Sequence, residues 1–276
     1  MFQFAFGQAL AAVTPHEVRY STDIFAQQST HNGYELDRVF DLNVAMTSTS
    51  DLRKIIGPLR VHPMYRRAMA KYQAPQCLLG KRFKIERKNA FYGNLVESLE
   101  AGGYLHGYWQ SERYFYSIAD QIRNAFTFRS VTNLVLPYRE RNNISVHVRR
   151  GDYLNAGSIH ASCNADYYSR ALDRLGLNAC DTRVYVFSDD PVWALKNLSN
   201  IHPNVYFFEG NVGADIYKDM YLISQCDHHI IANSSFSWWG AWLNPSPQKR
   251  VIAPKRWFSD PSLDDKDILP ESWERL

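Results

Sequence analysis

The sequence has 276 residues, of which 45% are hydrophobic and 21% charged, and its formal net charge is +3. These proportions are typical of a globular protein and argue against a disordered chain, while so small a net charge gives no support for a nucleic-acid partner. No stretch has the roughly 18 consecutive apolar residues of a membrane-spanning helix, and the first residues lack the basic start and cleavage site of a secretion signal.

The first half of the chain begins with an apolar helical pattern. Met1 leads directly into FQFAFGQAL, with no preceding residue that could cap a helix. A polar turn that contains His31 and Asn32 either contacts a sugar or forms a plain loop-to-helix connection. Residues 63–73 are predicted to form an exposed basic helix, and its notable side chains are Met64, Arg66, Arg67 and Lys71.

A strand and a longer helix are predicted next. Residues 104–110 are typical of a strand followed by a turn, Ser111 of a helix cap, and residues 112–126 of the helix itself. Trp109, in the turn, either stacks on a sugar ring or packs in a core or an interface. The polar run YRERNN follows, and we place the boundary of two domains there, giving residues 1–140 and 141–276.

The second half opens with the sequence ISVHVRRGDY at residues 144–153. Alternating apolar and polar residues predict a strand at 144–148, which brings Arg149 and Arg150 to a turn. A guanidinium group has a planar fork of donors that matches phosphate or carboxylate. The turn therefore either binds an anion, with Asp152 holding one arginine in place, or is an exposed turn with a weak local ion pair.

The segments after this strand alternate between helix and strand. The predicted elements are a helix at 165–175, a strand at 183–187, a helix at 191–198, a strand at 204–208, a helix at 215–226, a strand at 228–232, a helix at 236–243 and a strand at 250–253. Such alternation predicts an α/β fold with a mainly parallel, doubly wound sheet. Ligands of such sheets lie outside the carboxyl ends of the strands.

Polar side chains gather where the predicted strands end. They are Arg149, Arg150 and Asp152 after the first strand, Ser188, Asp189 and Asp190 after the second, Glu209 after the third, and Asn233, Ser234 and Ser235 after the fourth. A phosphate-bearing ligand suits such a set. Trp238, Trp239 and Trp242 follow with helical spacing, so we expect them to pack against the sheet, with a guanine or sugar platform as the alternative.

Three segments resemble the motifs of a known family. HVRRGDY at 147–153 is similar to the HxRRxDY signature of the α-1,2-fucosyltransferases, glycosyltransferase family 11, and part of it is shared with α-1,6- and protein O-fucosyltransferases. Residues 219–243 are similar to the second long motif of that family, and VFSDD at 186–190 also fits. The resemblance extends over nearly the whole chain and is of the bacterial type.

The resemblance implies a GT-B-like fold of two Rossmann-type domains. It also implies inverting, metal-independent transfer of L-fucose from GDP-fucose to the 2-hydroxyl of a terminal galactose, on an oligosaccharide or a lipid-linked glycan, with no cofactor. Arg149 and Arg150 are the predicted catalytic residues, because they would neutralise charge on the departing GDP. The predicted donor-binding residues are His147, Asp152, Ser188, Asp189, Asp219, Asn233, Ser234 and Ser235. The candidate acceptor-binding residues are His31, Asn32 and Trp109.

The sequence gives little support for a metal or a hydrolase site. His228 and His229 are adjacent in a predicted strand and point to opposite faces, so they cannot share an ion without other ligands. Asp265 and Asp267 have the DxD spacing of manganese-dependent glycosyltransferases but belong to a segment expected to be a solvated tail. No GxSxG pattern surrounds Ser234. The four cysteines lack CxxC spacing, and we expect reduced thiols.

In the resembling family the first helix follows a strand and a glycine-rich GGLGNQ turn, which the sequence lacks before Met1. Such a turn would present backbone N–H groups to an anion or shape a sugar site. The alternative function is therefore a non-catalytic nucleotide-sugar-binding or glycan-binding remnant of the family. We expect a cytoplasmic location, with peripheral attachment to the inner face of the membrane as an open alternative.

Overall fold

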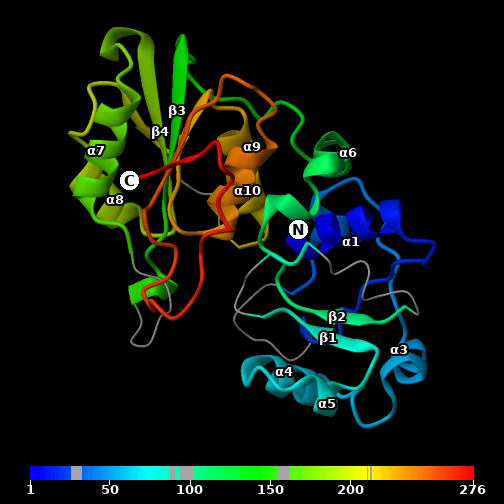
Figure 1. The fold of residues 1–276 in the computed structure, drawn as a ribbon. Coiled ribbons are helices and arrows are strands. Elements are labelled where there is room, and N and C mark those ends of the chain that lie inside the picture. The colour runs from blue at the N-terminus through cyan, green and yellow to red at the C-terminus, as the bar shows by residue number, and fades with distance from the viewer. Residues whose placement is uncertain (26–32, 88–90, 94–101, 155–161, 210, 212) are drawn as a thin grey trace. The chain divides into compact units, whose positions relative to one another are not determined.

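The chain forms two compact units in the computed structural model, which describes residues 1–25, 33–87, 91–93, 102–154, 162–209, 211 and 213–276 (Figure 1). Unit 1 is Met1–Thr127 with Asp264–Pro270, and unit 2 is Phe128–Leu263 with Glu271–Leu276. The polar run at 138–143 thus lies within unit 2, so the chain leaves unit 1 earlier than the predicted boundary at residue 140.

Unit 1 is mainly helical. Its α-helices are α1 (Phe2–Val13), α2 (Leu36–Val39), α3 (Thr49–Ile56), α4 (Pro63–Lys71), α5 (Gln76–Leu79) and α6 (Ala119–Ala125). Strands β1 (Phe83–Ile85) and β2 (Tyr104–His106) pair in parallel. Apolar side chains of α1 and of the turn after β2 form one core cluster, and α5, β1 and the end of α3 form another.

The predicted helix at 112–126 is divided. Ser111 does cap its start, because its Oγ accepts a hydrogen bond from the N–H of Arg113 at 3.4 Å. Two short 3-10 turns follow, η3 (Glu112–Tyr114) and η4 (Tyr116–Ile118), before α6 begins. Phe115 between them is fully buried and has a φ of −132°, far from helical values. Burial of this ring prevents a continuous helix.

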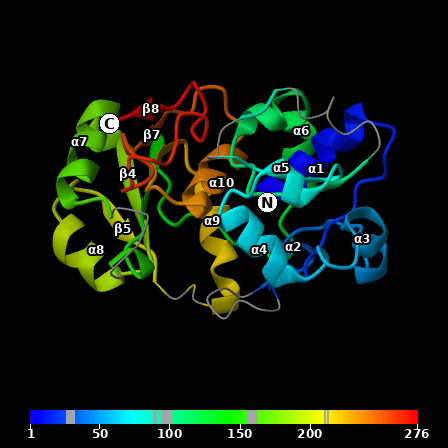
Figure 2. The ribbon, with the colours of Figure 1, turned by 60° about the horizontal axis from the view of Figure 1, so that its bottom comes forward.

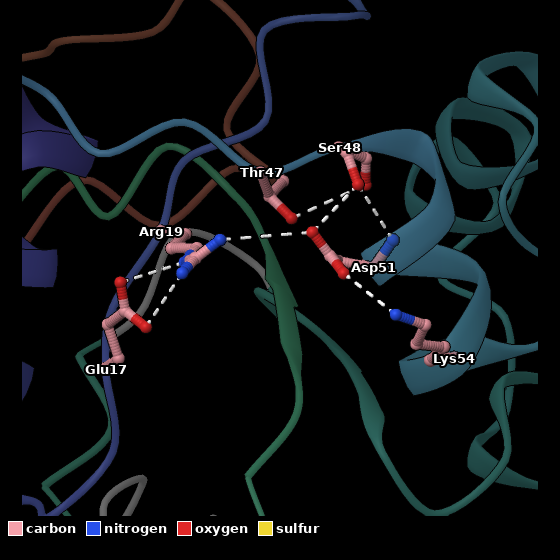
Figure 3. A network of polar contacts seen from close by, with 6 residues as sticks. All are labelled: Glu17, Arg19, Thr47, Ser48, Asp51 and Lys54. Carbon is pink, nitrogen blue, oxygen red and sulfur yellow. Dashed lines mark hydrogen bonds and ion pairs between the residues drawn. The ribbon is translucent and has the colours of Figure 1, made fainter.

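A capping network fixes the start of α3 (Figure 3). Ser48 Oγ accepts from the N–H of Asp51 at 3.1 Å and lies 2.8 Å from the Asp51 carboxylate. The same carboxylate lies 3.3 Å from Lys54 Nζ and 3.9 Å from Arg19, which also pairs with Glu17. The cap contributes about 1 kcal/mol to stability, whereas the exposed ion pairs contribute little.

Arg66 contradicts the prediction of an exposed basic helix at 63–73. Its side chain is fully buried, forms an ion pair with Asp23 and donates a hydrogen bond to Tyr104 Oη at 2.8 Å. A buried guanidinium needs such partners because leaving it unpaired would be costly. The helix is therefore anchored in unit 1 by one of the residues expected on its surface.

Unit 2 contains a six-stranded parallel sheet with the order β5-β4-β3-β6-β7-β8. The strands are β3 (Asn142–Val148), β4 (Thr182–Ser188), β5 (Val205–Phe207), β6 (His228–Ile230), β7 (Val251–Ala253) and β8 (Glu274–Arg275), and the α-helices are α7 (Ala165–Leu175), α8 (Pro191–Leu198), α9 (Tyr217–Ser224) and α10 (Ser235–Leu243). The predicted alternation is confirmed, and β8 is an additional strand of only two residues.

Helices cover both faces of this sheet (Figure 1). Apolar residues of α7 and α8 pack on one face with Val146 of β3 and Val184 of β4. Residues of α9 pack on the other face with Tyr185 and Phe187. The strands therefore have apolar residues on both faces, as expected for a buried parallel sheet.

The tryptophans of α10 pack in the core, as expected. Trp238 and Trp242 are buried, with ring planes 11° apart and centroids 5.9 Å apart, and Trp239 meets both edge-on. α10 also lies very close to α9, because a Cβ at Gly240 would be 2.6 Å from Ile223 Cγ2. This contact requires glycine.

The sheet has a topological switch point between β3 and β6. The chain leaves β3 through α7 toward β4, and it leaves β6 through α10 toward β7, on the opposite side. In doubly wound sheets, ligands bind outside the carboxyl ends of the strands at such a point. The loop after β3 is the one that carries Arg149 and Arg150.

Candidate functional site

One carboxylate organises the arginine turn. Asp189, just after β4, accepts hydrogen bonds from the N–H groups of Arg150 at 2.8 Å and Gly151 at 3.1 Å, one on each oxygen. Its Oδ2 also lies 3.2 Å from Nε of Arg149. A Cβ at Gly151 would be 3.1 Å from the same oxygen, so the residue there must be small. Asp189, a predicted donor-binding residue, thus fixes the turn.

Asp152 was predicted to hold one of the arginines. Its backbone starts the 3-10 turn η5 (Asp152–Leu154), and its side chain lies outside the described residues. Among the residues whose side chains are described, the carboxylates of Asp189 and Asp190, from the loop after β4, lie beside the two guanidiniums.

Arg150 is held by stacking as well as by charge. Its Cζ lies 4.0 Å from the ring centroid of Trp193, and its Nε lies 3.6 Å from Asp190. Asp190 also caps α8 by accepting from the N–H of Trp193 at 3.0 Å, and Ser188 Oγ accepts from the N–H of Asp190 at 2.9 Å. A cation over an aromatic face is stabilised by about 0.5–2 kcal/mol. Ser188, predicted to bind the donor, here positions Asp190.

Trp193 is a site residue that was not predicted, and Asp190 was predicted only as one of the polar residues at the strand ends. Asp190 precedes Pro191, a pattern typical of a helix start, and Trp193 lies three residues further on. These signals indicate the cap but not the stacking on Arg150, since that contact joins segments more than 40 residues apart.

Arg149 is more accessible than Arg150, with 27% of its side chain exposed against 14%. Its guanidinium lies 5.8 Å from the ring of Tyr153. The hydroxyl of Tyr153 donates to the backbone carbonyl of Asn233 at 2.9 Å. Tyr153 thereby joins the loop after β3 to the loop after β6, across the switch point.

The loop after β6 supplies three predicted residues with different surroundings. Asn233 is buried, and its Nδ2 donates to the carbonyl of Trp257 at 2.9 Å. Ser234 is the cap of α10, accepting from the N–H of Phe236 at 3.3 Å. Ser235, at the first turn of α10, is exposed. Two of the three thus stabilise the loop, and Ser235 offers its hydroxyl beside a helix N-terminus, where anions are favoured.

His147 is buried under the arginine turn. Burial, together with the nearby charge of Arg149, lowers its pKa to about 3. Within the described residues its Nδ1 has no hydrogen-bond partner, and its ring lies 5.3 Å from that of Phe236. A buried imidazole with so low a pKa stays neutral near pH 7, so His147 can pack and can donate or accept hydrogen bonds but carries no charge.

Asp219 lies in α9, near the carboxyl end of β5. Burial raises its pKa to about 6, although a hydrogen bond from Asn211 Nδ2 at 2.6 Å acts in the opposite direction. A desolvated carboxylate in a polar site is typical of ligand binding.

Of the three candidate acceptor-binding residues, only Trp109 lies within the described residues. Trp109 is buried, stacks on Phe6 with centroids 4.6 Å apart, and has a left-handed φ of 56°. Buried Glu86 holds this turn, accepting from the N–H groups of Tyr108 at 2.7 Å and Trp109 at 3.1 Å, and burial raises its pKa. The sugar-stacking role of Trp109 is therefore wrong. His31 and Asn32 lie outside the described residues.

Residues once considered for metal binding have structural partners. Both ring nitrogens of His229 are engaged, Nδ1 with Ser145 Oγ at 2.8 Å and Nε2 with Asn244 at 2.9 Å, and burial holds its pKa well below the usual range. Asp267 is buried and accepts from Arg113 at 2.7 Å, so the expected solvated tail is wrong at this residue. Throughout the described ranges, no group of three His, Cys, Asp or Glu is arranged to hold a metal ion.

Comparison with known proteins identifies the family. The model of glycosyl transferase family 11 matches residues 58–276. An alpha-1,2-colitosyltransferase of Escherichia coli is 33% identical over all of this chain and 94% of its own length. The O-antigen biosynthesis glycosyltransferase WbnK of Escherichia coli is 30% identical over 91% of this chain and 86% of its own.

A solved structure shows the fold. NodZ alpha-1,6-fucosyltransferase, soaked with GDP-fucose, aligns with a TM-score of 0.50 over 92% of this chain and 89% of its own, at 14% identity. The predicted GT-B-like α/β fold is confirmed. The match of the family model and the relatives of similar length lead to one conclusion: the chain is a glycosyltransferase that belongs to glycosyl transferase family 11.

Proposed function

We propose that this glycosyltransferase transfers L-fucose from GDP-fucose to the 2-hydroxyl of a terminal galactose, with inversion and without a metal ion. The observation that carries the proposal is the pair of guanidiniums at the switch point. Arg149 Nε lies 3.2 Å from Asp189, and Arg150 stacks on Trp193 with its Nε 3.6 Å from Asp190. These contacts orient the two planar groups before any ligand binds.

In the proposed reaction the acceptor oxygen forms a bond to C1 of fucose, and the bond from C1 to the β-phosphate oxygen breaks. The acceptor hydroxyl loses its proton, and GDP leaves with the bonding electron pair. Arg149, the more exposed cation, would contact the β-phosphate, and Arg150 would support it. Two preorganised cations can supply the charge stabilisation that a divalent metal supplies elsewhere.

The names of relatives support parts of this proposal. One relative is named for alpha-1,2 transfer, another for O-antigen biosynthesis, and the NodZ structure was soaked with GDP-fucose. An O-antigen acceptor would favour the lipid-linked glycan over a free oligosaccharide.

A second donor is favoured by the full-length match to a colitosyltransferase. Colitose is fucose without its 3-hydroxyl. A site that hydrogen-bonds a substrate hydroxyl rejects the analogue lacking it by about 10⁴-fold or more, whereas an apolar site discriminates weakly. Competition between the two GDP-sugars in one reaction would therefore measure which donor the site prefers.

The deciding experiment is mass spectrometry of products from GDP-fucose with lactose, N-acetyllactosamine and other β-galactosides, with a chelator present, alongside calorimetric titration of GDP. Fucosylated product would support the proposal. GDP binding without transfer to any acceptor would favour the non-catalytic alternative, and failure of both would refute the assignment of the donor site.

Arg149→Lys tests the proposed catalytic role. Lysine keeps the charge but loses the fork and the Nε contact to Asp189, so we expect turnover to fall about 10²-fold or more, with unfolding unchanged. Arg170→Lys in α7 is the matched control, because Arg170 is exposed and pairs with Asp166 along the helix. Near-normal turnover of Arg149→Lys would remove this residue from the mechanism.

A further inference from the structure

One segment of unit 1 has a charge composition unlike the rest of the chain. Residues 52–85 contain nine lysines and arginines and no aspartate or glutamate. The whole chain has 31 basic and 28 acidic residues, which leaves 22 basic and 28 acidic residues outside this segment. A protein of small net charge thus concentrates its positive charge in about an eighth of its length, all of which the structure describes.

The structure brings the ends of this segment together. The loop after α3 contacts α5, because Arg60 Nε donates to the carbonyl of Leu78 at 3.1 Å. α4 contacts the same carbonyl through the hydroxyl of Tyr65, at 3.1 Å. Both ribbon views place α4 and α5 next to each other (Figures 1 and 2). A cavity of about 300 Å³ lies here, and its lining includes Arg60, Lys81 and Arg82.

Exposed aliphatic side chains belong to residues that make these contacts or that directly precede them in the sequence. Leu59 is 82% exposed, Met64 66% and Leu78 51%. Leu59 precedes Arg60, Met64 precedes Tyr65, and Leu78 offers the carbonyl that both Arg60 and Tyr65 contact. Lys81 and Arg82 are exposed, and with Arg60 they line the cavity described above. We call these five side chains, Leu59, Met64, Leu78, Lys81 and Arg82, the basic face.

We propose that the basic face binds an anionic membrane surface. Lysine and arginine near such a surface are each attracted by about 1 kcal/mol, a factor of about five in binding, and exposed aliphatic side chains can enter the interface between headgroups and acyl chains. Nucleic acid would bind the cations but would leave the exposed leucine and methionine side chains without an apolar partner. A membrane surface can bind both kinds of side chain, so it is the occupant we propose.

The site lies within the part of the chain before β3, so its test does not involve the arginine turn. A role of the basic face in bringing the enzyme to a lipid-linked acceptor rests on the proposed function, but membrane binding itself does not. Binding to vesicles needs neither donor nor acceptor, and failure of either proposal leaves the other intact. The structure has no helix, among the residues that it describes, that is long and apolar enough to cross a membrane.

The first test is flotation of the whole protein with vesicles of phosphatidylcholine, alone or with about 30% phosphatidylglycerol. We expect binding to the anionic vesicles only, with a steep decrease as salt shortens the Debye length from about 10 Å toward 3 Å. Equal binding to both kinds of vesicle, or binding to neither, would overturn the proposal.

A matched pair of charge reversals locates the surface. Lys81→Glu with Arg82→Glu should lower the vesicle partition coefficient about 30-fold or more, since two attractions of about a factor of five each are lost. Lys255→Glu with Arg256→Glu makes the same change in an adjacent, exposed Lys-Arg pair of unit 2 and should retain most binding. Equal loss in both variants would mean that only net charge matters, and would refute the basic face.

Aliphatic residues separate a membrane from other polyanions. Leu59→Ser with Met64→Ser should weaken vesicle binding about 10-fold or more, because two apolar side chains no longer enter the interface between headgroups and acyl chains. Val192→Ser with Leu195→Ser, exposed by 77% and 52% in α8, is the control. The unmodified protein could instead bind duplex DNA and not vesicles. If the Lys81→Glu and Arg82→Glu substitutions then abolished DNA binding, the basic face would be assigned to nucleic acid. An unchanged urea unfolding transition, followed by circular dichroism, would verify that each variant is folded.

Discussion

Asp189 illustrates how much of a site can depend on one side chain. Its two oxygens hold two consecutive backbone N–H groups and approach the guanidinium of the residue before them. A carboxylate that accepts several N–H bonds fixes a loop more firmly than an ion pair between exposed side chains, because the backbone has fewer conformations to explore. The orientation of both arginines therefore depends on this residue.

We predict that Asp189→Ala will lower transfer about 10²-fold and weaken GDP binding, because the arginine turn loses its anchor. Stability should decrease by about 1–3 kcal/mol, since two backbone hydrogen bonds, one part-buried and one exposed, are lost at about 0.5–1.5 kcal/mol each. Steady-state kinetics and urea unfolding measure the two effects. Asp166→Ala in α7 removes an exposed carboxylate that pairs with Arg170 and should change neither quantity.

The raised pKa of Asp219 predicts opposite effects on stability and binding. The folded state keeps its proton up to about pH 6, whereas the unfolded chain releases it near pH 4, so this group makes stability fall as pH rises through that window and stay lower above it. We expect Asp219→Asn to raise the free energy of unfolding by about 1–3 kcal/mol at pH 7 and by little at pH 4.

If the Asp219 carboxylate accepts from guanine, only its ionised form binds GDP well. The affinity of the unmodified protein for GDP should then increase as pH rises through about 6, more steeply than the affinity of Asp219→Asn. Calorimetric titrations across this range decide the matter: parallel curves for the two proteins would exclude Asp219 from the guanine contact.

Residue types were easier to predict than their partners. The sequence singles out Arg149 and Arg150 because an alternating strand ends directly before them. It does not indicate that Asp189 and Trp193 hold them, since strand neighbours come from distant segments. Arg66 was misplaced on a surface for the same reason: its partners Asp23 and Tyr104 are 43 and 38 residues away in the sequence.

At the scale of elements, helix caps and other local sequence patterns predict the bounds of a helix correctly where tertiary packing agrees with them. α7 and α8 begin and end at the predicted residues, because Asn164 caps the first and Asp190 with Pro191 starts the second. The helix at 112–126 had a correct cap but no continuous helix, since the burial of Phe115 overrides local preference. β8 has two residues and forms only against β7, so no sequence pattern could reveal it.

Gly240 gives a prediction about the packing of α9 and α10. Alanine is the better helix former by about 1 kcal/mol, yet its Cβ would lie 2.6 Å from Ile223 Cγ2 and 3.0 Å from Ile223 Cβ. We expect Gly240→Ala to lower the free energy of unfolding by about 1–3 kcal/mol through overpacking.

The partner substitution checks the cause of this loss. Ile223→Ala alone should destabilise by about 2–5 kcal/mol through the cavity it leaves. In the Gly240→Ala, Ile223→Ala double variant the added methyl group fills part of that cavity. The decrease in the free energy of unfolding of the double variant should therefore be smaller than the sum of the decreases of the two single variants. Simple additivity in denaturant unfolding would show that the clash is not the reason.

At the scale of the whole molecule, the order of elements and three motifs were enough to predict the fold class and the family. The division into units was harder to predict, because the segment Asp264–Pro270 returns to unit 1 after the chain has formed most of unit 2. Asp267 holds that segment by accepting from Arg113 and from the N–H of Phe91. Such a long-range contact leaves no local pattern, and the DxD spacing suggested a different role.

The donor site also makes a prediction for the stability of the whole protein. A ligand that binds only the folded state adds about 2.7 kcal/mol at 100 times its Kd, which corresponds to an increase of about 5 °C in Tm for a chain of this size. We expect GDP to produce this increase equally with magnesium and with a chelator, because the proposed diphosphate contacts are guanidiniums. Arg149→Lys should reduce the increase, and Arg170→Lys should preserve it. An increase that requires magnesium would show that a metal ion takes part in diphosphate binding, and the arginine pair would then be insufficient by itself.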